Sequence, residues 1–208
     1  LVLGLGVVFQ GFWFQRIYCV GHEASHRKLF PEHKRINDWI GQLFLWIILV
    51  PLPIFRKIHK FHHASNRMDE FTSALDVYVV PKNGSALHRW KAHVLWYAAI
   101  GLGGWFVHSL VSILFFLFLP LKTAQRVSPA FIGWTRRDQL LSILCFIIPV
   151  SLHMGFILSS GLSLWISLYC LPLLVFSLVY SCQLYVYHYR TSIGPKTVFH
   201  ARRLSGPK

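Results

Sequence analysis

Long apolar stretches divide the chain, and their lengths limit how it can fold. Four of them cover residues 1–20, 94–119, 140–159 and 162–180. A helix of about 20 apolar residues crosses the hydrocarbon core of a bilayer, so these lengths are typical of spanning helices. Only 13% of the residues are charged, whereas a soluble domain has about 25%. These features predict an all-α integral membrane protein.

The chain is short enough for one domain, which we predict to be membrane-embedded over residues 1–208. It begins inside an apolar stretch without a methionine, and it stops at Lys208 without closing an element. We therefore expect a chain that is truncated at both ends.

The charge of the chain is strongly positive, with 21 Lys and Arg against 7 Asp and Glu. The basic residues form short clusters between the apolar stretches, such as Arg56-Lys57 and Arg136-Arg137. Lys and Arg accumulate in the cytoplasmic loops of membrane proteins, which explains this arrangement. We therefore expect a multi-pass membrane protein without a nucleic-acid partner.

Histidines gather where apolar segments end. His22 and His26 are four residues apart, and His59, His62 and His63 follow the pattern i, i+3, i+4. Residues at these spacings share one face of a helix. Ionisable groups at the border of an apolar segment are costly and usually functional. The two clusters therefore predict metal binding by all five imidazoles.

The segment between the two histidine clusters is unusual. Residues 39–55 are apolar but number only 17, and they include Pro51 and Pro53. If both clusters form one site, they lie on one side of the membrane, so this segment does not cross it. We expect an interfacial or re-entrant helix here, with the histidine clusters on the cytoplasmic face.

The remaining stretches follow from the same assumption. The loop 121–138 is basic and is placed on the cytoplasmic side, so residues 94–119 must return to that side or lie flat. Residues 140–159 and 162–180 are separated only by Ser160 and Gly161, which predicts a helical hairpin. This hairpin crosses the membrane twice and brings His188 to the face of the other five histidines.

Six imidazoles exceed the four ligands of a structural zinc site, so two metal ions are expected. Imidazole binds Zn, Cu, Fe and Ni, and a site at a membrane face suggests activation of dioxygen by iron. The other histidines have no such pattern. We expect structural roles for His108 and His153, and exposed positions for four residues in basic stretches: His33, His88, His93 and His200.

The motifs GHEASH, HKFHH and YHYRTSIGPK resemble those of the membrane-bound fatty acid desaturase and hydroxylase superfamily. The resemblance implies a di-iron centre whose metal ligands in this chain are His22, His26, His59, His62, His63 and His188. The final HxxHH box of the superfamily is absent from these residues. A fragment without that box is expected to be inactive.

The resemblance further implies an enzyme that uses O2 and external electrons to introduce a cis double bond into a fatty acyl lipid. The partners would be a membrane lipid and a separate cytochrome b5-like or ferredoxin-like donor. The membrane would be a bacterial inner membrane or the endoplasmic reticulum. Four carboxylates near the boxes are candidates for orienting the ligand imidazoles: Glu23, Asp69, Glu70 and Asp76.

Other readings of the same motifs stay open. An alkane or lipid hydroxylase and a carotenoid ketolase or hydroxylase carry similar boxes. Outside the superfamily, a membrane zinc hydrolase needs three histidines and a water, and a histidine-lined transporter would place them at mid-membrane depth. An inactive remnant is a further alternative.

Overall fold

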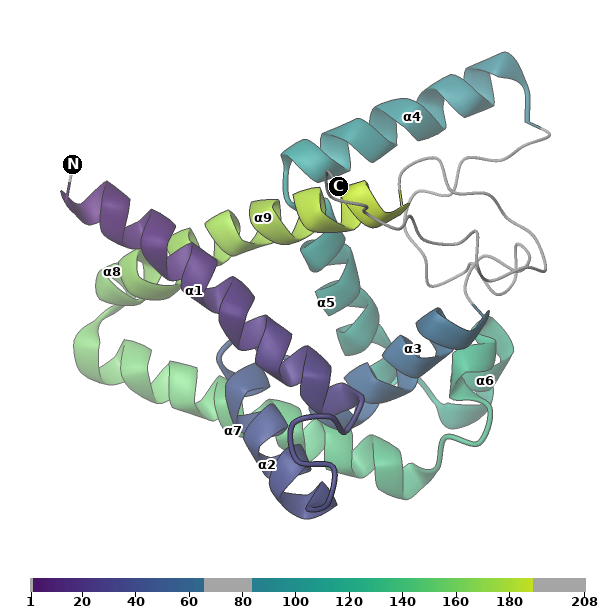
Figure 1. Ribbon diagram of the computed structural model, residues 1–208, viewed down its shortest axis with the longest axis horizontal. Coiled ribbons are helices and arrows are strands. Elements are labelled where there is room, and N and C mark those ends of the chain that lie inside the picture. Colours follow the sequence, from purple (N-terminus) through teal and green to yellow (C-terminus); the bar gives the residue numbers. More distant parts are fainter. Residues whose placement is uncertain (1, 66–83, 189–208) are drawn as a thin grey trace, which may run out of the picture.

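The computed structural model describes residues 2–65 and 84–188, and every regular element in these ranges is a helix (Figure 1). The first part contains α1 (Val2–Ser25), α2 (Lys34–Trp46) and α3 (Leu52–Ser65). The second part contains α4 (Ala86–Gly101), α5 (Gly104–Phe118), α6 (Leu121–Val127), the 3₁₀ turn η2 (Pro129–Phe131), α7 (Arg136–Ser160), α8 (Leu162–Trp165), the π-helical turn η3 (Ile166–Cys170) and α9 (Leu171–His188). The predicted all-helical fold is confirmed.

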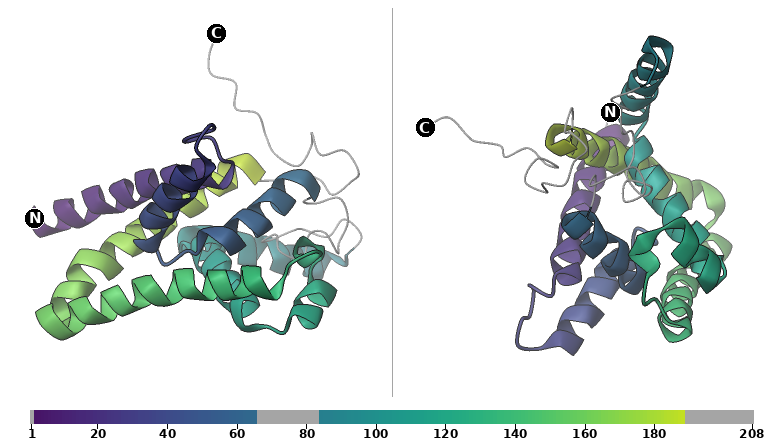
Figure 2. Two further views of the ribbon diagram at one scale, coloured as in Figure 1. Left: turned by 90° about the horizontal axis from the view of Figure 1, so that it is seen from below. Right: turned by 90° about the vertical axis from the view of Figure 1, so that its right-hand side faces the viewer.

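The predicted hairpin is present at the C-terminal end of the described chain. Thr135 and Asp138 form a capping box that starts α7, and the chain reverses at Gly161, whose φ of 90° suits only glycine. Continuous helix then runs through α8, η3 and α9 (Figure 2). Arg136–Ser160 and Leu162–His188 are the two described helices that are long and apolar enough to cross a membrane. α1 is not among them, so its role as a span stays a prediction.

The stretch 94–119 is not one straight helix. α4 and α5 meet at an angle of 94°, with Leu102 and Gly103 between them. Gly103 has a φ of 71°, and a Cβ there would lie 2.7 Å from Cβ of Ser177 on α9. Glycine therefore permits both the turn and the close approach to α9. Together the two helices are long and apolar enough for a broken span or a re-entrant loop, so the return of this stretch to one side stays a prediction.

The short segment 39–55 is not the single interfacial or re-entrant helix that its length and prolines predicted, because the chain forms parts of two helices here. α2 has 13 residues and α3 has 14, and the chain turns between them at residues 47–51. Gln42 is buried at this turn, where its side chain accepts from the backbone N–H of Leu52 and donates to the carbonyl of Val50. Because the turn's backbone groups are satisfied internally, the two helices form a fixed corner.

Packing gathers the ends of three helices. α1 lies against α9 and α2, α5 lies against α9, and α3 lies against α7 (Figure 1). The buried core is rich in aromatic rings, including Phe14, Trp105, Phe131 and Phe176. By contrast, α7 exposes a row of large apolar residues, among them Leu144 and Leu152, as expected for a helix that faces lipid. The core thus fixes α1, α3 and α9 beside one another.

Candidate metal centre

The histidines of the site come from the ends of helices. His22 lies in the last turn of α1, and His26 is the first residue beyond that helix. His59, His62 and His63 lie in the C-terminal half of α3. The helical spacing of each group turns its imidazoles to one face, and the two faces meet because α1 and α3 are in contact.

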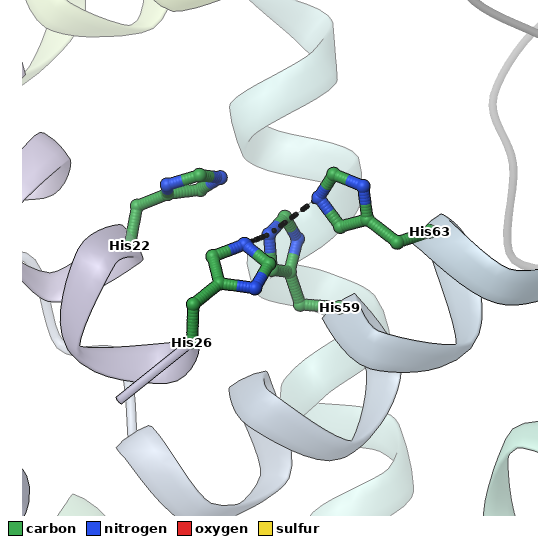
Figure 3. Close-up of side chains that lie close together, drawn as sticks. All are labelled: His22, His26, His59 and His63. Atoms are coloured by element: carbon green, nitrogen blue, oxygen red, sulfur yellow. Dashed lines mark hydrogen bonds between the residues drawn. The ribbon is translucent and has the colours of Figure 1, made fainter. Parts of the chain in front are cut away.

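Four of these side chains form one group, here called the four-histidine cluster: His22, His26, His59 and His63. One ring nitrogen from each lies within 4.8 Å of the others. Nε2 of His59 is 3.0 Å from Nε2 of His26 and 3.0 Å from Nε2 of His63 (Figure 3). His22 faces the same centre, with its ring centroid 4.5 Å from that of His59.

The surroundings of His26, His59 and His63 favour the neutral form of these three imidazoles. Burial lowers the pKa of His59, and the neighbouring imidazoles, His22 first, lower it further. The pKa values of His26 and His63 are lowered by the same two causes, in the same order. A neutral imidazole carries the lone pair that binds a metal ion. The lowered pKa values of His26, His59 and His63 therefore favour the form that binds a metal ion.

The geometry fits a metal ion. Bonds of about 2.1 Å from a metal to imidazole nitrogen place neighbouring ligand atoms about 3 Å apart, which matches the separations around His59. Nε2 of His59 carries either one N–H or one lone pair, so it cannot form full hydrogen bonds with Nε2 of both His26 and His63, whereas a metal ion can bind all three nitrogens. The residues present can hold a metal ion.

The other two predicted ligands form a second pair beside the cluster. The ring centroids of His62 and His188 are 5.2 Å apart, and that of His62 is 6.2 Å from His59. His188 is the last residue of α9 and is buried, with its ring 5.7 Å from that of Trp105 on α5. The fold therefore brings all six predicted ligands together, in groups of four and two.

Known proteins match this chain along almost its full length. The model of the fatty acid desaturase family matches residues 1–207. The chain belongs to the fatty acid desaturase family. The predicted resemblance is confirmed. The family is membrane-bound, which agrees with the two helices that are long and apolar enough to cross a membrane.

Individual relatives of this desaturase chain are named as lipid-modifying enzymes. It is 27% identical to the omega-3 fatty acid desaturase fat-1 of Caenorhabditis elegans over 187 residues, which cover 87% of this chain and 43% of that protein. It is 40% identical over 58 residues to an sn-1 acyl-lipid omega-3 desaturase (ferredoxin) of Synechocystis, which is 28% of this chain and 16% of that protein. An sn-1 oleoyl-lipid 12-desaturase of Anabaena variabilis is 29% identical over 70 residues, or 33% and 20%. The chain thus spans less than half the length of these relatives.

Carboxylates were predicted to orient the ligand imidazoles of the candidate metal centre. Glu23 does contact one of them, because its Oε1 lies 3.0 Å from Nδ1 of His22. That contact favours the tautomer whose Nε2 is free to bind a metal. The other three candidates, Asp69, Glu70 and Asp76, lie outside the described residues.

The histidines predicted to be structural or exposed stay apart from the four-histidine cluster. Nδ1 of His153 accepts a hydrogen bond of 3.0 Å from Nε1 of Trp165 in the hairpin, and His108 lies half-buried on α5. His33 and His88 are exposed. His93 is half-buried, and its Nδ1 lies 2.8 Å from the carbonyl oxygen of Arg89. His200 lies outside the described residues.

Sequence reasoning missed the polar residues that support the cluster. Arg56 on α3 and Asp38 on α2 form an ion pair beside the end of α1. A signal was available, because Arg56 precedes His59 by three residues and so lies on the histidine face of the helix. The partner, Asp38, carries no such signal, since only folding brings α2 to this place.

Proposed function

We propose that this chain forms the histidine-bearing part of a membrane di-iron desaturase that introduces a cis double bond into a fatty acyl lipid. The observation that carries the proposal is the convergence of four imidazoles in a chain of the desaturase family. The names of the relatives add support, since each describes a desaturase that acts on fatty acids or acyl lipids.

Two sets of residues would hold the metal ions. His22, His26, His59 and His63 would bind the first iron, and His62 and His188 would contribute to the second. When bound, iron would supply the activation of O2 that breaks unactivated C–H bonds. The protein's own task is to position these ligands and to exclude water from the reaction.

Water exclusion is a role of α5 and α9. His188 is buried against Trp105, whose side chain is itself buried. The indole of Trp105 therefore shields one side of His188 from solvent. A dry site strengthens the interaction of charges with their ligands and limits side reactions.

The substrate and the electrons would reach the site from different directions. We place the histidine groups at the cytoplasmic face of a multi-pass protein, where an acyl chain enters from the adjacent bilayer. Electrons would come from a separate cytochrome b5-like or ferredoxin-like protein, and the word ferredoxin in the name of the Synechocystis relative favours the second.

The test is an assay of the full-length protein in membranes with acyl lipid, O2 and reduced ferredoxin. We expect products that have lost two hydrogens and contain no label from isotopic dioxygen, together with bound iron. Withholding O2, or the substitution His59→Ala, is expected to abolish product, because His59 contacts every other member of the cluster. Incorporation of labelled oxygen would indicate a hydroxylase, and bound zinc with O2-independent activity would indicate a hydrolase.

A further inference from the structure

A polar contact joins the two helices that carry the four-histidine cluster. Arg56 lies on α3, and its guanidinium is directed at the end of α1. Its Nε donates to the backbone carbonyl of Ser25 at 3.1 Å, and Nη2 donates to the carbonyl of Ala24 at 3.0 Å. Carbonyls in the last turn of a helix lack partners within the helix and attract cationic groups. Arg56 therefore caps α1 from the neighbouring helix.

The guanidinium is itself held in place. Asp38 of α2 accepts from Nη1 at its Oδ2, at 3.0 Å, and from Nη2 at its Oδ1. Two parallel hydrogen bonds of this kind fix the orientation of an arginine as well as its position. Although burial acts to raise it, hydrogen bonds from Arg56 and Asn37 lower the pKa of the Asp38 carboxyl, so this group stays ionised.

Asn37 completes the network. Its side chain is fully buried and donates to the carbonyl of Ala24 and to Oδ1 of Asp38, both at 2.9 Å. Its Oδ1 accepts from the backbone N–H of Leu29 at 3.2 Å, in the loop that follows His26. The end of α1 is thus tied to α2 and α3 by three neighbouring polar side chains.

These contacts lie next to the proposed metal ligands on both helices, α1 and α3. Ser25, whose carbonyl Arg56 binds, directly precedes His26, and the chain leaves the helix at Arg27 with a φ of 60°. On α3, Arg56 is one helical turn before His59. Arg56 thus joins the two helices within one turn of His26 and His59, whose Nε2 atoms lie 3.0 Å apart.

We propose that Arg56 is a positioning residue of the metal centre: held by Asp38, it locks the end of α1 onto α3 so that the imidazoles of the two helices converge. This inference rests on the proposed function, since it assumes that the four-histidine cluster binds a metal. Groups that orient ligands typically change metal affinity by about 10- to 100-fold when they are removed.

The experiment titrates Co²⁺ into the full-length protein in detergent and follows the visible absorption of the bound ion. The variants are Arg56→Gln, which removes both the charge and the paired N–H donors of the guanidinium, and Arg56→Lys, which keeps only the charge. Lys57→Gln is the matched control, because Lys57 is the next residue and donates to the carbonyl of Ile132, away from the cluster. Circular dichroism and the midpoint of thermal unfolding report on the fold.

We expect Arg56→Gln to weaken Co²⁺ binding roughly 10- to 100-fold and to shift the absorption bands, with helix content unchanged. Arg56→Lys should lie between this variant and the wild type, and Lys57→Gln should match the wild type. Wild-type affinity and spectrum in both Arg56 variants would overturn the inference. If Arg56→Gln does not fold, wild-type binding by Arg56→Lys would overturn it instead.

The same titration distinguishes a failure of the role of Arg56 from a failure of the proposed metal centre. If the wild-type protein binds no Co²⁺ at the cluster, the proposed metal centre fails and the role of Arg56 fails with it. If the wild type binds Co²⁺ and the Arg56 variants bind it equally well, only the role of Arg56 fails.

Discussion

Two histidine environments in this molecule differ in what each imidazole faces. In the four-histidine cluster, imidazoles face other imidazoles, with Nε2 of His26 and Nε2 of His59 3.0 Å apart. In the hairpin, His153 faces an indole donor, because Trp165 donates to its Nδ1 at 3.0 Å, and the ring of Tyr169 packs on it at 4.3 Å. The first environment leaves several lone pairs directed at one centre, whereas the second already satisfies the lone pair with a protein donor.

The comparison shows why counting histidines is a weak guide to metal sites. Each environment borders or lies within apolar helix, and each contains a half-buried imidazole. The difference lies in the partners that the fold supplies. A lone histidine beside a donor stabilises helix packing, whereas histidines grouped without other donors form a site for a cation.

The strongest effect is expected from substitution of His62, which lies beside the four-histidine cluster. We expect His62→Ala to abolish product and to lower bound iron by at least half, because His62 pairs with His188 rather than with the other four. Metal analysis of the purified full-length protein and product analysis by mass spectrometry check this. His108→Ala, on α5, serves as the control and should retain its iron; loss of iron there would show that the histidines have been divided wrongly.

A smaller effect is expected at the edge of the cluster. Glu23→Ala removes the carboxylate that orients Nδ1 of His22, and we expect activity to fall about 10-fold. Glu23→Gln keeps an acceptor oxygen and should recover part of that loss. Glu32→Ala removes an exposed acidic residue of the loop after α1 and should have no effect. Equal activities in the three variants and the wild type would remove Glu23 from the site.

The smallest effect is expected in the hairpin. His153→Phe leaves the indole of Trp165 without its acceptor, which should lower the free energy of unfolding by about 1 kcal/mol. Iron content and the rate of product formation should be unchanged. Denaturant unfolding in detergent measures the loss, and a double-mutant cycle with Trp165→Phe isolates the hydrogen bond. A fall in bound iron would show that His153 contributes to metal binding and not only to helix packing.

The sequence was sufficient to predict the helical hairpin and the approach of all six histidines, whereas the division of residues 39–55 between two helices was not predicted. Spacing and apolar length carry that information, because helical periodicity fixes which side chains share a face. The division of the six into a group of four and a pair was not predictable. His62 and His63 are adjacent in sequence, yet they point to different neighbours, and only the placement of α9 brings His188 to one of them.

The support of the site was only partly within reach of sequence patterns. The spacing of Arg56 and His59 places both on one face of a helix, but the partners of Arg56 at the end of α1 and on α2 are known only from the fold. The contact joins residues about thirty positions apart, across a corner whose angle depends on the buried Gln42. Long-range polar contacts of this kind follow from the packing of elements, which local periodicity does not encode.

The hairpin has a consequence for how such a protein enters a membrane. From Gln139 to Tyr189 the chain contains no Lys, Arg, Asp or Glu, and the reversal at Gly161 lies inside this uncharged region. Each charged residue at the centre of a spanning helix adds roughly 2.5 to 3.5 kcal/mol to the cost of insertion. The whole region therefore avoids this cost in both arms, and the charged residues Arg136 and Arg137 lie just outside it.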